Sequence, residues 1–146
     1  MPKRILFLCH GNICRSAAAE AIAKDILEKE GRADEFFIDS SAISNEEIGN
    51  PIYPPMREEL NRRGIAIPDH RAKRTSEKEI ASFDEVYYMD QSNRRLLSYA
   101  GLLKPNVFDI CEFGNGFDEI EDPWYSGRYG LVVDQLLVCI NAILHR

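Results

Sequence analysis

"RILFLCHGNICRSAAAEAIAKDILEKEG", residues 4–31, places an apolar run, a short polar loop and an alanine-rich segment in immediate succession. The continuous apolar run at 4–9 is typical of a strand that is covered on both faces. Residues 16–31 are mainly strong helix formers, and Gly31 is placed to end the helix. The stretch therefore predicts a strand, a tight loop and a helix.

The rest of the chain continues this alternation. Further strands are predicted at 36–39, 83–90 and 106–110, and further helices at 54–64, 91–101 and from about 128 to the C-terminus. Asp90 is placed to cap the helix at 91–101, and 111–127 is expected to be a long surface loop. The pattern predicts an α/β fold with a four-stranded parallel sheet and helices on both faces. Such sheets bind ligands at the carboxyl ends of their strands, where the loop after residue 9 lies.

Size and charge restrict the class of protein. The chain has 146 residues, 45% of them apolar and 29% charged, which suits a single domain over 1–146. A net charge of −6 argues against a protein that coats nucleic acid, so no nucleic-acid partner is expected.

Neither apolar segment suits export or membrane insertion. The N-terminal run is too short for a signal-peptide core and stops at His10, and the stretch at 131–144 is interrupted by Asp134, Gln135 and Asn141. The second stretch is expected to be a buried helix. We therefore expect a cytoplasmic protein without a membrane partner.

The cysteines are expected to be reduced thiols, since their spacing does not resemble a disulfide framework. There is no C-x-x-C pair, so no structural metal site is expected. Two of the thiols are assigned to the core, Cys111 and Cys139, and two lie in the loop after the first strand, Cys9 and Cys14.

The loop "CHGNICRS", residues 9–16, combines several features that suit an anion. Backbone N–H groups at the start of a helix can converge on one point, and Arg15 adds a two-pronged cationic side chain. Gly11 and Asn12 are the residues that best tolerate a left-handed backbone. The same donors, with the Ser16 hydroxyl, would favour a thiolate at Cys9. Each feature is common alone, but together they predict a thiolate nucleophile that faces a bound phosphate.

Attack on a phosphate monoester also needs a proton for the leaving oxygen, and "EDPWY", residues 121–125, supplies a carboxylic acid. Pro123 favours an extended backbone at Asp122, and the rings of Trp124 and Tyr125 can form an apolar wall beside it. An Asp-Pro pair is ordinarily only a turn. The role of Asp122 as an acid is therefore predicted only jointly with Cys9.

These motifs together resemble the low molecular weight protein tyrosine phosphatases. "CHGNICRS" resembles the active-site loop of that family and "EDPWY" its acid loop. Three further segments match in order, "IDSSAIS" (38–44), "DHRAKR" (69–74) and "YYMDQSNRRLL" (87–97), so the resemblance spans essentially the whole chain. It implies a flavodoxin-like single domain and a hydrolase that needs neither a metal nor a cofactor.

The resemblance also implies a two-step mechanism. Cys9 would attack phosphorus to form a cysteinyl-phosphate while Asp122 protonates the tyrosine oxygen, and water would then hydrolyse the intermediate with Asp122 as base. The equatorial oxygens would be held by the Arg15 side chain and by the backbone amides of His10, Gly11, Asn12, Ile13, Cys14 and Arg15. The implied partners are phosphotyrosine proteins, a tyrosine kinase being one candidate, and phosphate or other oxyanions.

By the same resemblance a hydrogen-bond network of Asn12, Ser16, Ser40 and His70 holds the loop in shape. Cys14 matches a second loop cysteine that can form a disulfide with Cys9 and so protect it from irreversible oxidation. Without the resemblance, His70 would be read as an ordinary surface imidazole.

The chain departs from the family pattern at the pocket wall, which we assign to His10, Glu46, Trp124 and Tyr125. The family has an aliphatic residue where this chain has His10, and often a large aromatic residue where counting from Ser40 places Glu46. These two changes predict a more polar pocket wall with altered substrate preference.

Two other functions fit parts of the sequence. A thioredoxin-linked arsenate reductase of the same fold uses additional cysteines after the third strand, but residues 81–104 contain none. A non-catalytic phosphate-binding module would explain the anion-binding loop but not the presence of Asp122. The nucleotide-binding motif GxxxxGK[ST] is absent.

Overall fold

Four parallel strands form one sheet in the computed structural model, which describes residues 1–146. They are β1 (Lys3–Cys9), β2 (Phe36–Ala42), β3 (Glu85–Tyr88) and β4 (Val107–Asp109), in the order β2-β1-β3-β4. The predicted four-stranded parallel sheet is confirmed. The strand order reverses between β1 and β3, so the loop after β1 lies at the switch point where such sheets bind ligands.

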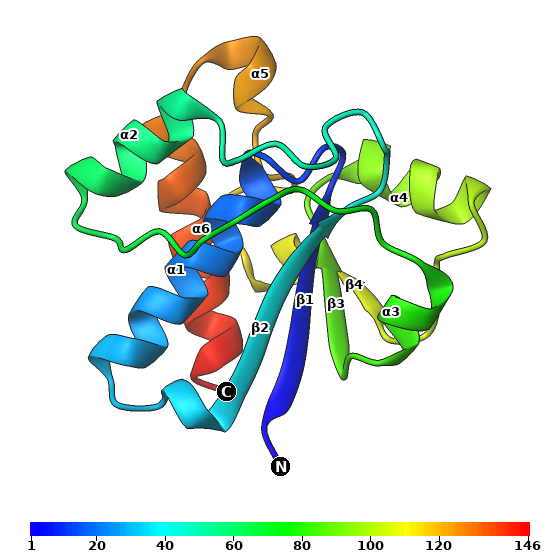
Figure 1. The fold of residues 1–146 in the computed structure, drawn as a ribbon, viewed down its shortest axis with the longest axis horizontal. Helices are drawn as coiled ribbons and strands as arrows, with labels where there is room; N and C mark the ends of the chain where they lie inside the picture. The colour runs from blue at the N-terminus through cyan, green and yellow to red at the C-terminus, as the bar shows by residue number, and fades with distance from the viewer.

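Helices cover both faces of the sheet (Figure 1). On one face lie α1 (Arg15–Lys29), α2 (Pro54–Arg62) and α6 (Tyr129–Leu144), and on the other lie α3 (Glu77–Ala81) and α4 (Gln91–Tyr99). Three short helical segments complete the fold: η1 (Ala33–Glu35), η2 (Ile110–Phe113) and α5 (Pro123–Ser126). In Figure 1, α5 lies beyond the carboxyl ends of the strands, at the same end of the sheet as the loop after β1.

The continuous apolar run of β1 serves two cores at once. Side chains along a strand alternate between its faces. Ile5 and Phe7 belong to the larger core under α1 and α6, whereas Leu6 and Leu8 belong to the smaller core under α3 and α4. This explains why β1 shows no alternation of polar and apolar residues.

Besides differences of one or two residues at several element ends, the structure departs from the prediction in three places. Strand β2 extends to Ala42, not to residue 39, because it stays paired with β1 until Ala42 lies opposite Cys9. Helix α3 was not predicted, since five residues are too few to show a helical period, although the Ser76 hydroxyl caps it by accepting the Glu79 N–H at 3.1 Å. The segment 111–127 is not one loop, because η2 and α5 lie within it.

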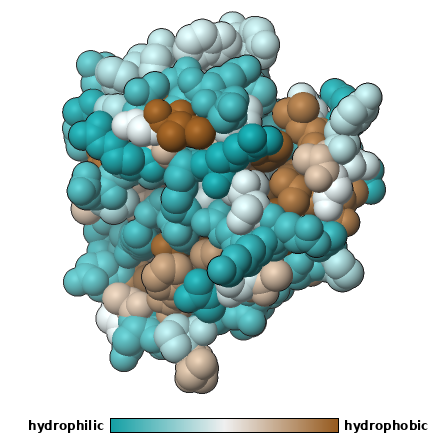
Figure 2. All heavy atoms as spheres, turned by 45° about the vertical axis from the view of Figure 1, so that its right-hand side comes forward, coloured by the Kyte–Doolittle hydropathy of each residue, from teal (hydrophilic) through white to brown (hydrophobic).

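The assignment of both remaining cysteines to the core holds for one of them. Cys139 on α6 is fully buried, whereas Cys111 on η2 is only partly buried against the same core. No helix is both long and apolar enough to cross a membrane. Figure 2 shows a mainly hydrophilic surface on which apolar residues form separate patches.

Candidate active site

The loop between β1 and α1 wraps around the sulfur of Cys9. Cys9 Sγ accepts the backbone N–H groups of Asn12 at 3.3 Å and Ser16 at 3.4 Å, and it lies 3.0 Å from Ser16 Oγ. Cys9 is buried at the carboxyl end of β1, facing the N-terminus of α1. Two backbone donors, a hydroxyl and a helix N-terminus all favour negative charge on this sulfur.

Asn12 has the only left-handed backbone among the non-glycine residues, with φ of 61°. Its buried side-chain amide donates to Ser16 Oγ and to Ser40 Oγ, both at 2.9 Å. Its Oδ1 accepts the backbone N–H of Lys73 at 3.2 Å. The side chain therefore ties the loop to α1, to β2 and to the segment before α3.

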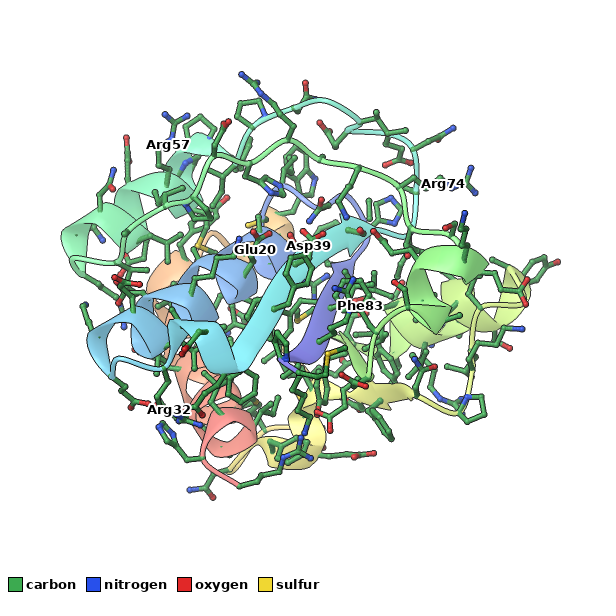
Figure 3. The ribbon with its side chains drawn as sticks, turned by 60° about the horizontal axis from the view of Figure 1, so that its bottom comes forward. Glu20, Arg32, Asp39, Arg57, Arg74 and Phe83 are labelled. Atoms are coloured by element: carbon green, nitrogen blue, oxygen red, sulfur yellow. The ribbon has the colours of Figure 1, made fainter.

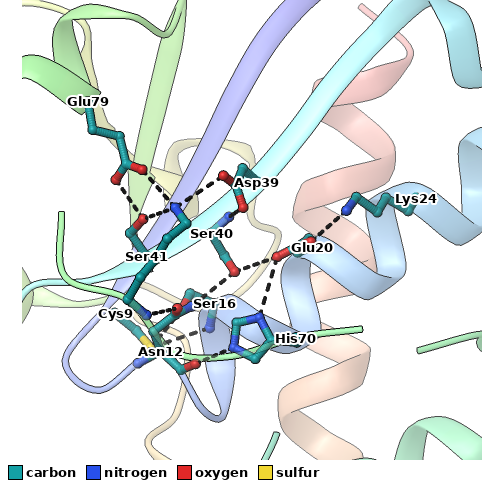
Figure 4. A network of polar contacts seen from close by, with 11 residues as sticks. Cys9, Asn12, Ser16, Glu20, Lys24, Asp39, Ser40, Ser41, His70 and Glu79 are labelled. Atoms are coloured by element: carbon teal, nitrogen blue, oxygen red, sulfur yellow. Dashed lines mark hydrogen bonds and ion pairs between the residues drawn. The ribbon is translucent and has the colours of Figure 1, made fainter. Parts of the chain in front are cut away.

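A network of polar side chains extends from Asn12 to α1 and β2 (Figure 4). Ser40 Oγ donates to Glu20 Oε1 at 2.6 Å, and Lys24 Nζ donates to Glu20 Oε2 at 2.6 Å. His70 Nε2 donates to the Asn12 carbonyl at 2.6 Å, while its Nδ1 lies 3.8 Å from Glu20 Oε1. The predicted members of the network, Asn12, Ser16, Ser40 and His70, are thus brought together around a buried glutamate.

Glu20 itself was not predicted to belong to this site. It is 4% exposed, and Figure 3 shows it between α1 and β2, whereas Arg57 and Arg74 lie at the edge of the molecule. A carboxylate this deeply buried needs partners. It has them in Ser40 and Lys24, so it belongs to the internal support of the loop.

Arg15, the first residue of α1, is 4% exposed. One guanidinium nitrogen donates to Asp90 Oδ2 at 2.8 Å and to the Ile120 carbonyl at 2.9 Å. The other lies 3.6 Å from Asp122 Oδ2. Burial disfavours the charge, but Cys9, Asp90 and Asp122 outweigh that effect and hold the pKa of Arg15 above its ordinary value.

Asp122 begins α5, and its Oδ1 caps this helix by accepting the Trp124 N–H at 3.1 Å. Oδ2 is left to face Arg15, and the side chain is 37% exposed. The structure therefore brings together Cys9, Arg15 and Asp122, although more than a hundred residues separate the last from the first two. A solvent-accessible carboxyl beside a cationic anion-binding side chain can exchange protons with a bound phosphate ester.

These groups line one cavity of about 690 Å³. Its wall is rich in aromatic residues, and the rings of Tyr53 and Trp124 lie tilted by 53° to each other with their centroids 5.6 Å apart. Trp124 and Tyr125 are well exposed at its edge. The predicted loop and wall residues that line it are Cys9, His10, Gly11, Asn12, Ile13, Cys14, Arg15, Glu46, Asp122, Trp124 and Tyr125.

The two departures from the family pattern contact each other. His10 Nε2 and Glu46 Oε2 lie 2.8 Å apart on the cavity wall. Since a carboxylate only accepts, the Nε2 atom of the imidazole carries the proton in this bond. His10 and Glu46 thus act as a pair, which the sequence did not show.

Cys14 is a thiol at neutral pH. Burial, reinforced by the nearby charge of Cys9, raises the pKa of Cys14 well above its ordinary value. The two loop cysteines therefore differ in character, since only Cys9 has donors directed at its sulfur.

Seven further residues line the cavity without having been assigned to it: Glu47, Tyr53, Asp90, Ser92, Asn93, Leu96 and Tyr129. Asp90 was predicted only as a helix cap, which it is, accepting the Asn93 N–H at 2.7 Å through Oδ1. Asp90 also bonds Arg15. This contact could have been predicted, because Asp90 follows the carboxyl end of β3, and that end lies beside the end of β1 that carries Cys9. No cluster of three or more His, Cys, Asp or Glu side chains is arranged to hold a metal ion.

Comparison with known proteins identifies relatives along the whole chain. Residues 4–143 match the family model described as low molecular weight phosphotyrosine protein phosphatase. A phosphatase of that name from Rattus norvegicus is 35% identical, with 99% of this chain and 95% of the rat protein covered. The crystal structure of YfkJ from Bacillus subtilis superposes with a TM-score of 0.91 at 32% identity and covers 99% of this chain and 93% of YfkJ. The structure of a Drosophila arginine phosphatase superposes with a TM-score of 0.83 at 27% identity, covering 96% and 94% of the two chains.

Proposed function

Because the chain belongs to the low molecular weight phosphotyrosine protein phosphatase family, we propose that it hydrolyses phosphotyrosine and small aryl phosphates through a cysteinyl-phosphate intermediate. The observation that carries this proposal is the convergence of Cys9, Arg15 and Asp122 on one cavity. Phosphotyrosine proteins are the proposed partners.

In the first step Cys9 Sγ attacks phosphorus. An S–P bond forms, the bond from phosphorus to the tyrosine oxygen breaks, and the Asp122 carboxylic acid donates its proton to that oxygen. The donors around the Cys9 sulfur stabilise the negative charge of the attacking sulfur, so the mechanism needs no separate base beside it.

Arg15 and the loop amides hold the transferring phosphoryl group. The guanidinium is already fixed on one side by Asp90 and the Ile120 carbonyl. Its other nitrogen, which now faces Asp122, is available for an equatorial oxygen. Such fixed donors stabilise the transition state because they need not reorganise as charge develops.

In the second step a water molecule attacks the cysteinyl-phosphate, and the Asp122 carboxylate accepts its proton. The S–P bond breaks, and phosphate and the Cys9 thiolate are released. Asp122 suits both steps because its side chain is partly exposed and lies next to the phosphate-binding arginine.

A thiol relay of the arsenate reductase type is not favoured by the structure. Cys111 lines a neighbouring cavity and Cys139 is buried on α6, so neither faces the Cys9 sulfur in the active-site cavity. Cys14 alone shares that cavity with Cys9. We propose that, once a peroxide has oxidised Cys9 to a sulfenic acid, the Cys14 thiol displaces water from it to form a disulfide, which protects Cys9 from further, irreversible oxidation.

The test is hydrolysis of p-nitrophenyl phosphate and a phosphotyrosine peptide between pH 4.5 and 8, with EDTA present. We expect metal-independent turnover that Cys9→Ser abolishes and Asp122→Asn strongly reduces. Phosphoarginine and arsenate are tested separately as alternative substrates. Folded wild-type protein that hydrolyses neither p-nitrophenyl phosphate nor the phosphotyrosine peptide would contradict the proposal. Turnover of phosphoarginine alone would then indicate an arginine phosphatase, and turnover of arsenate alone an arsenate reductase.

A further inference from the structure

We propose that the pair of His10 and Glu46, together with Glu47, forms an anionic rim that selects phosphotyrosine sites flanked by basic residues. We call these three residues the acidic rim. The inference rests on the proposed function and adds the substrate class to it. Its structural basis is the negative charge of Glu46 and Glu47 at the wall of the cavity, whereas the cation that would bind phosphate, Arg15, lies at the floor.

The acidic rim is held in place by the backbone. The His10 carbonyl accepts the Ser44 N–H at 3.0 Å and the Ser44 hydroxyl at 2.9 Å. The loop that carries Glu46 is thereby fixed against the loop after β1, and the bond from Glu46 to His10 is a third link between them. Although the Glu46 side chain is 65% exposed, its carboxylate therefore has a defined position.

The acidic rim carries net negative charge because it holds two carboxylates and only one imidazole. His10 donates its Nε2–H to Glu46. Glu47 bonds only to a neutral amide, that of Asn50 at 2.6 Å. A methyl group on Gly11 would lie 3.2 Å from Glu47 Cγ, so this side chain passes directly over the phosphate-binding loop.

A second acidic surface adjoins the active-site cavity. A neighbouring cavity of about 660 Å³ shares Asp90 and Ser92 with it. Four further carboxylates line that cavity against a single cation, Arg95; they are Asp109, Glu112, Asp118 and Glu119. Burial, and to a smaller extent the charges of nearby carboxylates, raises the pKa of Asp109 above its ordinary value.

Positive and negative charge are thus separated by depth. Arg15 lies at the floor and is nearly inaccessible, so it can meet the phosphate but not the flanking peptide. The flanking residues instead meet the carboxylates of the acidic rim and those of the neighbouring cavity. Basic flanking side chains would be attracted and acidic ones repelled, each contact changing kcat/KM by roughly two- to fivefold.

The experiment compares three phosphotyrosine peptides that differ only in the residues flanking phosphotyrosine: lysine, glutamine or glutamate. The kcat/KM ratio of the lysine to the glutamate peptide is measured at low salt for wild type, Glu46→Gln and Glu46→Lys. Glu28→Gln is the matched control, because Glu28 is an exposed residue near the far end of α1 and its change alters net charge equally. Using ratios removes any effect of a variant on turnover itself.

We expect wild type to prefer the lysine peptide by about tenfold, and the preference to shrink as salt is added. Glu46→Gln should lower the ratio by roughly two- to fivefold and Glu46→Lys should lower it further, whereas Glu28→Gln should leave it unchanged. Equal kcat/KM for all three peptides in wild type, or an unchanged ratio in both Glu46 variants, would overturn the inference while leaving the phosphatase proposal intact. Absence of hydrolysis of every peptide and of p-nitrophenyl phosphate would overturn the proposed function and this inference with it.

Discussion

Replacement of Asn12 tests how the active-site loop is held. Without the side chain, Ser16 keeps its contact with Cys9 and Ser40 keeps its bond to Glu20, so only the Lys73 N–H loses its partner. The loss of two side-chain donor bonds costs about 0.5–1.5 kcal/mol each, and an unpaired donor on a partly buried residue adds about 1 kcal/mol. We therefore expect Asn12→Gly to lower the free energy of unfolding by about 2–4 kcal/mol.

Asn12→Ala should cost more than Asn12→Gly. The φ of 61° penalises alanine by about 1–2 kcal/mol, whereas glycine adopts it freely but gains entropy in the unfolded chain worth about 0.4–1 kcal/mol. The alanine variant should thus be less stable than the glycine variant by about 1 kcal/mol. Guanidinium chloride unfolding at pH 7 measures both values.

The control is Asn141, an exposed residue within α6, where the order should reverse because alanine is the better helix former by about 1 kcal/mol. The reasoning is refuted if alanine is as stable as glycine at position 12, or if both variants at that position match wild type. Either result would show that the left-handed backbone and the amide bonds do not determine the stability of this loop.

Three other predictions follow from the charges. Asp90→Asn removes the carboxylate nearest to buried Arg15 but leaves Asp122 beside it. We therefore expect the free energy of unfolding to fall by less than the about 3–5 kcal/mol lost when a buried pair is fully broken, and inorganic phosphate should stabilise this variant more than it stabilises wild type. Burial opposes ionisation of Glu85, but hydrogen bonds from two cations and a tyrosine lower its pKa to about 2, below the ordinary 4.5. The ionised Glu85 therefore stabilises the folded protein fully above about pH 5, and this contribution is lost as the pH falls toward 2. The deficit of Glu85→Gln in chemical unfolding should accordingly shrink between about pH 5 and pH 3, and a constant deficit would contradict this assignment. Because burial raises the pKa of Cys14, iodoacetamide at pH 7 should label Cys9 and spare Cys14 in peptide mass spectrometry, and equal labelling would show that the two thiols do not differ.

Local sequence was sufficient where the site is built from neighbouring residues. The apolar run of β1, the glycine and asparagine of the loop and the alanine-rich helix predicted the strand, loop and helix around Cys9, because each preference acts within a few residues. Cys9 and Arg15 belong to this local unit. Their positions needed no knowledge of the rest of the fold.

Contacts between distant segments were not predictable from local preferences. The strand was expected to stop before Ser40, since serine-rich sequence favours turns, yet pairing with β1 extends β2 to Ala42. The second role of Asp90 depends on the strand order, which places the end of β3 beside that of β1. The bond between His10 and Glu46 depends on how Ser44 anchors one loop on the other.

The most direct test of the phosphatase mechanism is detection of the phosphorylated enzyme. Asp122→Asn is mixed with p-nitrophenyl phosphate, quenched rapidly and analysed by peptide mass spectrometry, with Cys9→Ser as the control. The mechanism predicts one phosphoryl group on Cys9, which accumulates because the residue that activates water is missing, and none in Cys9→Ser. Turnover by wild type with no phosphoryl group on Cys9 in any quenched sample, or with the group on another residue, would contradict it.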